Sequence, residues 1–215
     1  MSNVGTFDSA TSKWELDTNG NGLWEGCAID TCVTSFGQPG DLPVTRHLSG
    51  LNGTIIGVFQ PQTTITANGK TVTKRGYWRF DLNANNSFDN CSTDECADFG
   101  GQASRPVVGD WAGTGSEEIG IFRPRSGEWY LDYNGNGKLN ACGVDKCLGP
   151  FGETNDLPVA GDWDGTGQVR IGVFRPSTGK WFLDLNGNGK LDSCTVDACL
   201  GPFGQPGDLP VVGKW

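Results

Sequence analysis

Short apolar runs bounded by glycine and proline recur along the chain, and the last recurrence shows the pattern best. It predicts strands at Val169 to Phe174, Lys180 to Leu185, Leu200 to Gly204 and Leu209 to Gly213. Ser177-Thr178-Gly179 is a turn signal between the first two. Alternation of apolar and polar residues is weak, which is expected where a sheet is buried on both faces. The pattern therefore predicts an all-β chain.

Four copies of this pattern align when four tryptophans are placed in register. These are Trp14, Trp78, Trp129 and Trp181. The repeats run approximately over residues 4–47, 54–110, 117–162 and 169–215. The first two copies are further apart than the others because residues 62–75 form a polar, threonine-rich insertion, which we expect to be an extended hairpin or a flexible loop. Four strands recurring at about 50 residues predict the blades of one β-propeller domain over residues 1–215.

The two ends of the sequence complement each other. The last predicted strand, Leu209 to Gly213, stops where the next strand of the pattern would follow, and Val4-Gly5-Thr6-Phe7 begins where that strand would lie. Pairing the two would close a ring and remove both open sheet edges. We therefore expect a four-bladed β-propeller with ring closure between its N- and C-terminal strands. A piece of a larger ring is the alternative.

Composition supports an all-β fold and excludes some functions. Glycine (34) and proline (11) interrupt every window long enough for a helix, and no apolar run approaches the length of a transmembrane helix. The net charge of −9 disfavours a nucleic-acid partner, because no basic patch is present to neutralise phosphates.

The strongest chemical signal is a repeated loop with oxygen-bearing side chains at places 1, 3, 5, 9 and 14. The four loops span residues 17–30, 81–94, 132–145 and 184–197. Hard oxygen ligands at alternating places, with a glycine at place 6 where the chain turns, are what a calcium loop requires. Backbone carbonyls at place 7 would add a ligand, as in an EF-hand loop. The loops hold 11 of the 25 carboxylates, and four divalent cations would bring the formal charge to −1.

The candidate calcium ligands follow the same order in every loop. They are Asp17, Asn19, Asn21, Leu23, Glu25 and Asp30 in the first loop, Asp81, Asn83, Asn85, Ser87, Asp89 and Asp94 in the second, Asp132, Asn134, Asn136, Lys138, Asn140 and Asp145 in the third, and Asp184, Asn186, Asn188, Lys190, Asp192 and Asp197 in the fourth.

Calcium has two rivals at these loops. Asn-Gly turns between strands commonly carry the same residues without an ion. Magnesium prefers fewer protein ligands and more water. The second loop matches least well, since Asn86 stands where the others have glycine, although asparagine tolerates left-handed backbone. Four copies with five side-chain oxygens each favour about four calcium ions per chain.

Eight cysteines form four Cys-x4-Cys pairs, one in each loop region. Local bridging would give Cys27–Cys32, Cys91–Cys96, Cys142–Cys147 and Cys194–Cys199. This is the simplest connectivity, although spacing alone does not prove it. Zinc is the rival reading, but zinc sites favour closer spacings with histidine or a second pair, and His47 is the one histidine. Matched disulfides indicate an oxidising compartment. Because Met1-Ser2-Asn3 starts no signal peptide, we expect a mature domain of a longer secreted precursor.

Other candidates carry less information. The loop Asp162 to Gly167 also resembles a calcium loop, but its copy at residues 110–115 lacks the second acid, which favours a structural turn. The four aligned tryptophans are expected in the core between blades; a ring of sugar-stacking platforms is the alternative. His47 has no identifiable serine or cysteine partner, so nucleophilic catalysis lacks its base. We expect no enzyme, while paired carboxylates for glycoside hydrolysis remain open.

The segment at 157–181 resembles the FG-GAP/VCBS repeat family. It reads Leu-Pro-Val-Ala-Gly-Asp-Trp-Asp-Gly-Thr-Gly, followed by Ile-Gly-Val-Phe-Arg-Pro-Ser-Thr-Gly-Lys-Trp after three residues. That family forms integrin-α-like propellers in secreted proteins and usually binds calcium in an Asp-x-Asp-Gly-x-Gly loop, which this chain matches only at 162–167. The resemblance implies an extracellular adhesion or ligand-binding scaffold and names no ligand.

These observations predict a secreted, calcium-binding β-propeller that acts as a recognition, adhesion or structural module. Its expected partner is an extracellular protein or glycan, with no nucleic acid and no membrane span. A carbohydrate-binding lectin and a hydrolase domain of a larger secreted protein are the alternative functions.

Overall fold

The computed structural model describes residues 4–51, 53–67 and 69–212, which form fifteen strands and no helix. The strands are β1 (Gly5–Asp8), β2 (Lys13–Leu16), β3 (Thr31–Val33), β4 (Leu42–His47), β5 (Thr54–Ala67), β6 (Lys70–Phe80), β7 (Glu95–Asp98), β8 (Arg105–Gly109), β9 (Glu118–Arg123), β10 (Glu128–Leu131), β11 (Lys146–Leu148), β12 (Leu157–Gly161), β13 (Arg170–Arg175), β14 (Lys180–Leu183) and β15 (Ala198–Leu200). The all-β prediction is confirmed, and this described part contains no helix that could cross a membrane.

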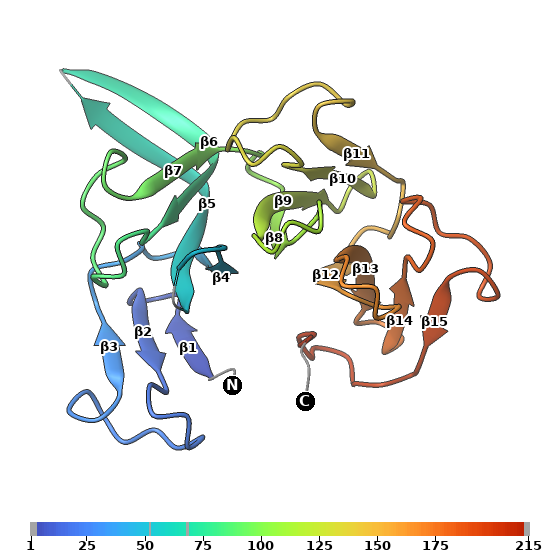
Figure 1. Cartoon of the computed structure of the whole chain (residues 1–215), viewed down its shortest axis with the longest axis horizontal. Coiled ribbons are helices and arrows are strands. Elements are labelled where there is room, and N and C mark those ends of the chain that lie inside the picture. Colours follow the sequence, from blue (N-terminus) through green and yellow to red (C-terminus); the bar gives the residue numbers. More distant parts are fainter. Residues whose placement is uncertain (1–3, 52, 68, 213–215) are drawn as a thin grey trace. The chain divides into compact units, whose positions relative to one another are not determined.

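The strands form four antiparallel sheets in the orders β1-β2-β3, β4-β5-β6-β7, β8-β9-β10-β11 and β12-β13-β14-β15 (Figure 1). The chain is thus a four-bladed β-propeller, as its four repeats predict. The second, third and fourth sheets each begin one strand earlier than the aligned repeat, because β4, β8 and β12 each pair with the strand that follows in the chain. In the last sheet, for example, Leu157 of β12 lies opposite Phe174 of β13, and Gly161 lies opposite Arg170.

The last predicted strand is the main difference from the expectation. Residues 209–212 form no strand, and residue 213 lies outside the described residues. Leu209 is 78% exposed and Val211 is 69% exposed, so neither side chain gains the burial that stabilises the matching strand Leu157–Gly161. The first sheet therefore has three strands, and the described residues do not include the predicted closing strand.

Another predicted strand is displaced along the chain. The third strand of the last sheet is Ala198–Leu200 and not Leu200 to Gly204. Pro202 has no N–H to donate to a ladder, so the strand ends before Gly201-Pro202.

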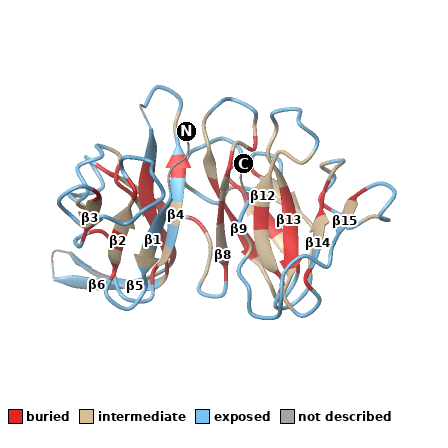
Figure 2. Cartoon of the chain, turned by 90° about the horizontal axis from the view of Figure 1, so that it is seen from below, coloured by how far each residue is buried: buried red, intermediate tan, exposed pale blue. Residues whose placement is uncertain are grey.

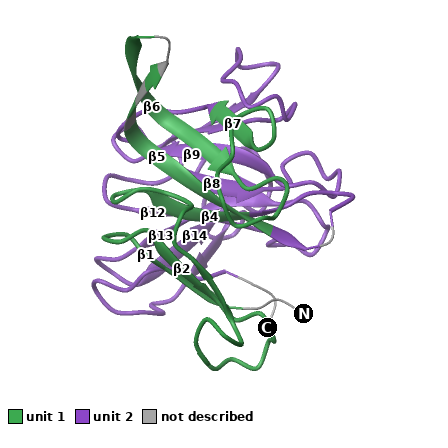
Figure 3. Ribbon diagram, turned by 90° about the vertical axis from the view of Figure 1, so that its left-hand side faces the viewer, with its two compact units in different colours: residues 1–45, 55–97 green, residues 46–54, 98–215 purple. Residues whose placement is uncertain are grey.

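The chain divides into two compact units, residues 1–45 with 55–97 and residues 46–54 with 98–215 (Figure 3). Most of the buried apolar residues lie on the strands, while the connecting loops are mostly exposed (Figure 2). In the first unit, Trp14 of the first sheet and Phe36, which follows that sheet, pack with Val58 of the second sheet. In the second unit, Trp129 of the third sheet packs in one cluster with Val173 of the fourth.

Three of the four aligned tryptophans lie in the core as expected. Trp14, Trp78 and Trp129 are at most 3% exposed, while Trp181 is half-buried. The indole N–H of Trp129 donates to the Phe151 carbonyl at 2.8 Å, which ties β10 to the segment that follows β11. The three buried rings offer no face for a sugar to stack on.

The insertion at 62–75 is an extended hairpin. Strands β5 and β6 pair from Gly57 opposite Phe80 to Ala67 opposite Lys70, in ten residue pairs. The matching hairpins β9–β10 and β13–β14 have four pairs each. Extra pairs carry the two strands beyond their sheet as a ribbon (Figures 1 and 3).

Candidate metal centre

Each candidate calcium loop starts at the end of the second strand of the aligned hairpin, because the place-1 aspartate follows that strand directly. Asp81 follows β6, Asp132 follows β10 and Asp184 follows β14. The backbone N–H of Asp184 donates to the Ile171 carbonyl at 3.1 Å, and Asp132 makes the equivalent bond to Ile119 at 3.0 Å. The loop is thereby fixed to the sheet at its first residue.

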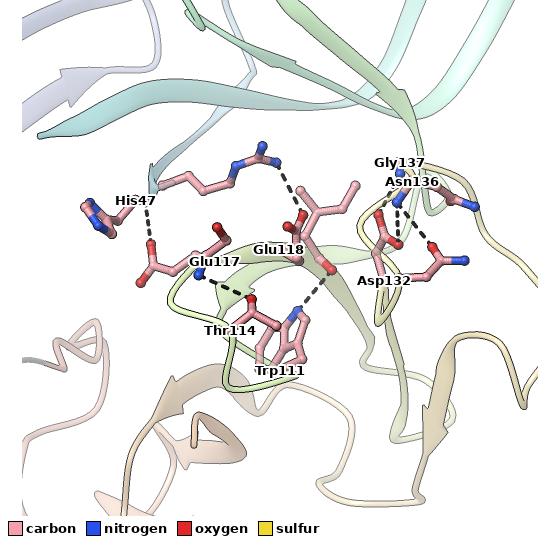
Figure 4. Close-up of polar contacts among 12 residues, drawn as sticks. His47, Trp111, Thr114, Glu117, Glu118, Asp132, Asn136 and Gly137 are labelled. Carbon is pink, nitrogen blue, oxygen red and sulfur yellow. Dashed lines mark hydrogen bonds and ion pairs between the residues drawn. The ribbon is translucent and has the colours of Figure 1, made fainter. Parts of the chain in front are cut away.

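The place-1 carboxylates are buried and accept backbone N–H groups from inside the loop. Their exposed fractions are 7% for Asp17 and 1% for Asp81, Asp132 and Asp184. In the fourth loop, Gly187 N–H donates to Asp184 Oδ1 at 2.8 Å and Gly189 N–H donates to Oδ2 at 2.8 Å. Figure 4 shows the third loop, where Gly137 N–H at place 6 donates to Asp132 Oδ2 and Asn136 N–H at place 5 donates to Oδ1. These bonds wind the loop around one carboxylate.

That winding places the residues at places 4 and 6 in left-handed backbone. In the fourth loop, Gly187 and Gly189 both have φ of 71°. The second loop adopts the same geometry without glycine, with φ of 56° at Ala84 and 65° at Asn86. Asn86 therefore adopts the left-handed backbone that asparagine is expected to tolerate. The requirement at place 4 was not predicted, although three of the four loops have glycine there.

The place-14 aspartates close the loops. Asp30, Asp94, Asp145 and Asp197 are 2–3% exposed, and each accepts the place-9 N–H at 2.6–2.8 Å. In the first, second and fourth loops the other oxygen accepts the place-2 N–H at 3.2 Å. In the third loop, Asp145 Oδ1 is buried and has no hydrogen-bond partner. The place-14 aspartate closes each loop by accepting hydrogen bonds from backbone N–H groups.

A disulfide encloses each closing aspartate. The bonds are Cys27–Cys32, Cys91–Cys96, Cys142–Cys147 and Cys194–Cys199, with Cα–Cα distances of 5.2–5.3 Å. The predicted local pairing is confirmed, and the described residues include no free cysteine. With both sulfurs of each pair bonded to each other, the predicted alternative of zinc bound by thiolates is removed. Bonds of this kind persist in oxidising compartments.

Places 3, 5 and 9 come together on the exposed side of each loop. In the fourth loop, Asn186 and Asn188 donate their amide N–H groups to one oxygen of Asp192, at 2.9 and 2.7 Å. The same arrangement holds at Glu25, Asp89 and Asn140. The three side chains therefore surround one point, with the amide nitrogens directed toward it.

The residues at place 7 were predicted to offer their carbonyl groups. In the structure their N–H groups donate to the side-chain oxygen of the place-5 asparagine at 2.8–2.9 Å. The residues are Leu23, Ser87, Lys138 and Lys190.

Electrostatics distinguish the inside of a loop from its rim. Burial raises the pKa of Asp184, backbone N–H groups of Gly189 and Gly187 lower it, and the Asp197 carboxylate raises it again. The pKa values of Asp81 and Asp132 are raised for the same reasons. At the rim, hydrogen bonds from Asn186 and Asn188 lower the pKa of Asp192. Each of these loops thus holds two buried carboxylates that repel each other.

The donor set fits a hard cation only in part. Carboxylates and amide oxygens suit calcium, and Asp145 Oδ1 is a buried acceptor without a hydrogen-bond partner. Within residues 4–51, 53–67 and 69–212, however, no three histidine, cysteine or carboxylate side chains form a group that could hold a metal. A cation in these loops would need asparagine and backbone oxygens as well, and the asparagine amides would have to turn.

The loop at 162–167 behaves as a turn. Gly167 N–H donates to Asp162 Oδ2 at 2.9 Å. Asp164 accepts from Thr166 and lies 2.6 Å from Arg170, and these contacts lower the pKa of Asp164 to about 2. The contacts are those of a backbone turn closed by an ion pair, as expected from the sequence.

A polar cluster near His47 was not predicted. The His47 N–H donates to Glu117 Oε2 at 2.7 Å, and Arg46 Nη1 lies 3.9 Å from Glu118 Oε2 (Figure 4). The ring Nδ1 of His47 is 3.2 Å from the Gly53 carbonyl. These contacts hold His47 in place. None of them involves a hydroxyl or thiol group that the histidine could activate.

Comparisons with known proteins do not assign the chain to a family. No family model matches the sequence, and no curated protein or solved structure matches it either.

Proposed function

We propose that this chain is a secreted, calcium-binding β-propeller that acts as an extracellular recognition or structural module, without catalysis. The observation that carries the proposal is the pair of buried carboxylates at places 1 and 14, present in all four loops. The resemblance to FG-GAP/VCBS repeats at 157–181 supports the extracellular role, as do the four disulfides.

A cation would resolve the charge problem inside each loop. Two ionised carboxylates in a buried site repel each other, and backbone N–H groups compensate them only in part. A divalent ion would neutralise both and remove their repulsion. Calcium suits the site better than magnesium, because it accepts many protein oxygens in a flexible arrangement.

The proposal assigns different roles to the two parts of each loop. The aspartates at places 1 and 14 would supply charge from the inside. Rotation of the amides at places 3 and 5 would present oxygen in place of nitrogen, beside the place-9 side chain. The third loop has the neutral Asn140 at place 9, whereas the others have an acid there. We therefore expect the third loop to have the lowest calcium affinity.

Elemental analysis of the purified protein, followed by calorimetric titration with calcium, tests the proposal. We expect about four ions per chain and a melting temperature several degrees lower in EDTA, because a ligand at 100 times its Kd stabilises the folded state by about 2.7 kcal/mol. Protein that carries no ion and takes up none would overturn the proposal.

Two substitutions make the titration specific to the loops. Asp192→Asn should weaken calcium binding in the fourth loop to about the affinity of the third, and Asn140→Asp should strengthen binding in the third. Glu128→Gln removes one acidic charge outside the loops and serves as the matched control. Equal effects of Glu128→Gln and Asp192→Asn would mean that calcium binding depends on the overall negative charge and not on the loops.

A further inference from the structure

The hairpin insertion carries a charge opposite to that of the rest of the molecule. Residues 60–80 contain Lys70, Lys74, Arg75 and Arg79 and no acidic residue. The remainder has 12 cationic and 25 acidic residues, a formal charge of −13. The metal loops do not use these cations. We refer to residues 62–75, the part of the hairpin beyond the length of its counterparts, as the arm.

The arm has open strand edges. Strand β5 has 14 residues and β6 has 11, whereas their outer neighbours β4 and β7 have six and four. Neighbours this short cannot pair along the whole hairpin, and the arm extends beyond the sheet (Figure 3). An open edge presents a row of backbone N–H and C=O groups to another extended chain.

Side chains of the arm divide between two faces. Cross-strand partners share a face, so the pairs Gln62–Arg75, Thr64–Thr73 and Thr66–Thr71 lie together, and all six residues are exposed. The hydroxyls of Thr66 and Thr71 are 3.0 Å apart. Lys70 and Lys74 alternate with the threonines of β6 and point to the opposite face. In the arm, where its outer edge is open, β6 therefore carries cations on both of its faces.

We propose that the outer edge of β6 in the arm binds an acidic peptide segment in extended conformation, which adds to the hairpin as a further strand. The backbone edge would supply main-chain hydrogen bonds, and carboxylates on the two faces of the incoming strand would meet Arg75 on one side and Lys70 and Lys74 on the other. The inference rests on the proposed recognition function and uses residues outside the metal loops.

The backbone edge is what favours a peptide over an acidic polysaccharide. Its donors and acceptors repeat with the spacing of a β-strand, and only another polypeptide matches both that spacing and the alternation of faces. Lysine on an edge strand also discourages unwanted pairing. A strand with carboxylates opposite these cations would pair with the edge, whereas a strand without them would leave the cations unpaired. The edge would therefore select acidic strands.

Titration with a blocked octapeptide of alternating glutamate and threonine tests the proposal. We expect saturable binding that weakens at higher salt. Lys70→Gln, Lys74→Gln and Arg75→Gln combined should weaken it at least tenfold. The triple variant Arg125→Gln, Lys146→Gln and Lys180→Gln removes the same charge elsewhere and should change it less than twofold. Equal losses in the two triple variants would overturn the proposal.

Two further measurements test the mode of binding. Hydrogen exchange should slow at the amides of residues 70–75 when the peptide binds, and a peptide N-methylated at alternate residues should not bind. Binding of the N-methylated peptide, or stronger binding of a sulfated polysaccharide without amide protection, would overturn strand addition.

A variant in which Ser-Thr-Gly, the turn found at 177–179, replaces residues 62–75 separates this inference from the proposed function. It should lose peptide binding and keep calcium binding. Calcium binding without peptide binding in the native chain would contradict the arm proposal alone, and peptide binding without calcium binding would contradict the metal proposal alone.

Discussion

The second and fourth candidate calcium loops reach the same conformation from different residues. In both, the place-6 N–H donates to Oδ2 of the first aspartate, at 2.6 Å to Asp81 and 2.8 Å to Asp184. In both, the place-9 N–H donates to the closing aspartate, at 2.8 Å to Asp94 and 2.7 Å to Asp197. The residues that must adopt left-handed backbone nevertheless differ.

Glycine occupies both left-handed places in the fourth loop, whereas Ala84 and Asn86 occupy them in the second. Left-handed backbone costs a residue with a Cβ atom roughly 1–2 kcal/mol. Since the second loop accepts that cost, glycine does not determine the loop conformation. The two buried aspartates determine it, and glycine lowers the energy of forming it.

Removal of the first aspartate should have the largest effect and should affect both loops equally. Asp184→Ala leaves two backbone N–H groups of the loop without their carboxylate partner, as Asp81→Ala does in the second loop. Hydrogen bonds to charged groups contribute about 1.5–3 kcal/mol each, so each variant should lose about 3 kcal/mol of unfolding free energy in EDTA. Urea denaturation measures the loss.

Asp192→Ala is the control for this pair, because Asp192 lies on the exposed rim and accepts from two asparagine side chains. It should cost less than half as much. A large loss in one loop only would show that different groups organise the two loops.

Opening a disulfide should have the next largest effect. Cys194→Ser with Cys199→Ser removes a bond that closes a segment with a sequence separation of 5, for which chain entropy predicts about 2 kcal/mol. The same double substitution at Cys91 and Cys96 should cost a similar amount. Denaturation of the two variants measures the difference, and thiol titration of the native chain should find almost no free thiols. Several free thiols per chain would contradict the pairing.

Much of this fold follows from repetition in the sequence. Four aligned tryptophans give the number of blades, and the cysteine pairs give the local disulfides. The loops at 17–30 and 184–197 repeat so closely that their buried first and last residues could be located. These features depend on local spacing, which the sequence displays directly.

Other features depend on contacts that spacing does not show. The closing aspartate was expected to serve an ion, and in the structure it first satisfies backbone N–H groups. Ala84 gave no sign of left-handed backbone, because the carboxylate that requires it lies three residues earlier. The contact of Arg46 with Glu118 joins residues 72 positions apart, and no repeat copies it.

Exchanging residues at the left-handed places should give a smaller effect of opposite sign in the two loops. Ala84→Gly relieves the strain in the second loop and should stabilise the chain by about 1 kcal/mol. Gly187→Ala introduces the strain in the fourth loop and should destabilise it by a similar amount; its Cβ would also lie 3.4 Å from Arg170. Thermal denaturation of both variants measures the effects. Stabilisation by both substitutions would contradict a shared backbone geometry.

The smallest expected effect is a change in how stability depends on pH in EDTA. Burial raises the pKa of Asp81 and of Asp184, and a second carboxylate in each loop raises it further. Because the folded-state pKa lies above the unfolded one, the folded chain binds more protons, so this contribution is greatest below the unfolded pKa and is lost as pH rises through the folded pKa. Native protein should therefore gain stability over Asp184→Asn as the pH falls from 7 toward 4.

The same comparison with Asp81→Asn should give an equal slope, since both loops bury the same pair of groups. Melting curves at several pH values measure it, with Asp192→Asn as the control of opposite sign, because hydrogen bonds lower the pKa of Asp192. Saturating calcium should reverse the slope at both sites, because a bound cation keeps the carboxylates ionised and so lowers their pKa in the folded chain. A slope that calcium leaves unchanged would mean that the paired carboxylates are not where the ion binds.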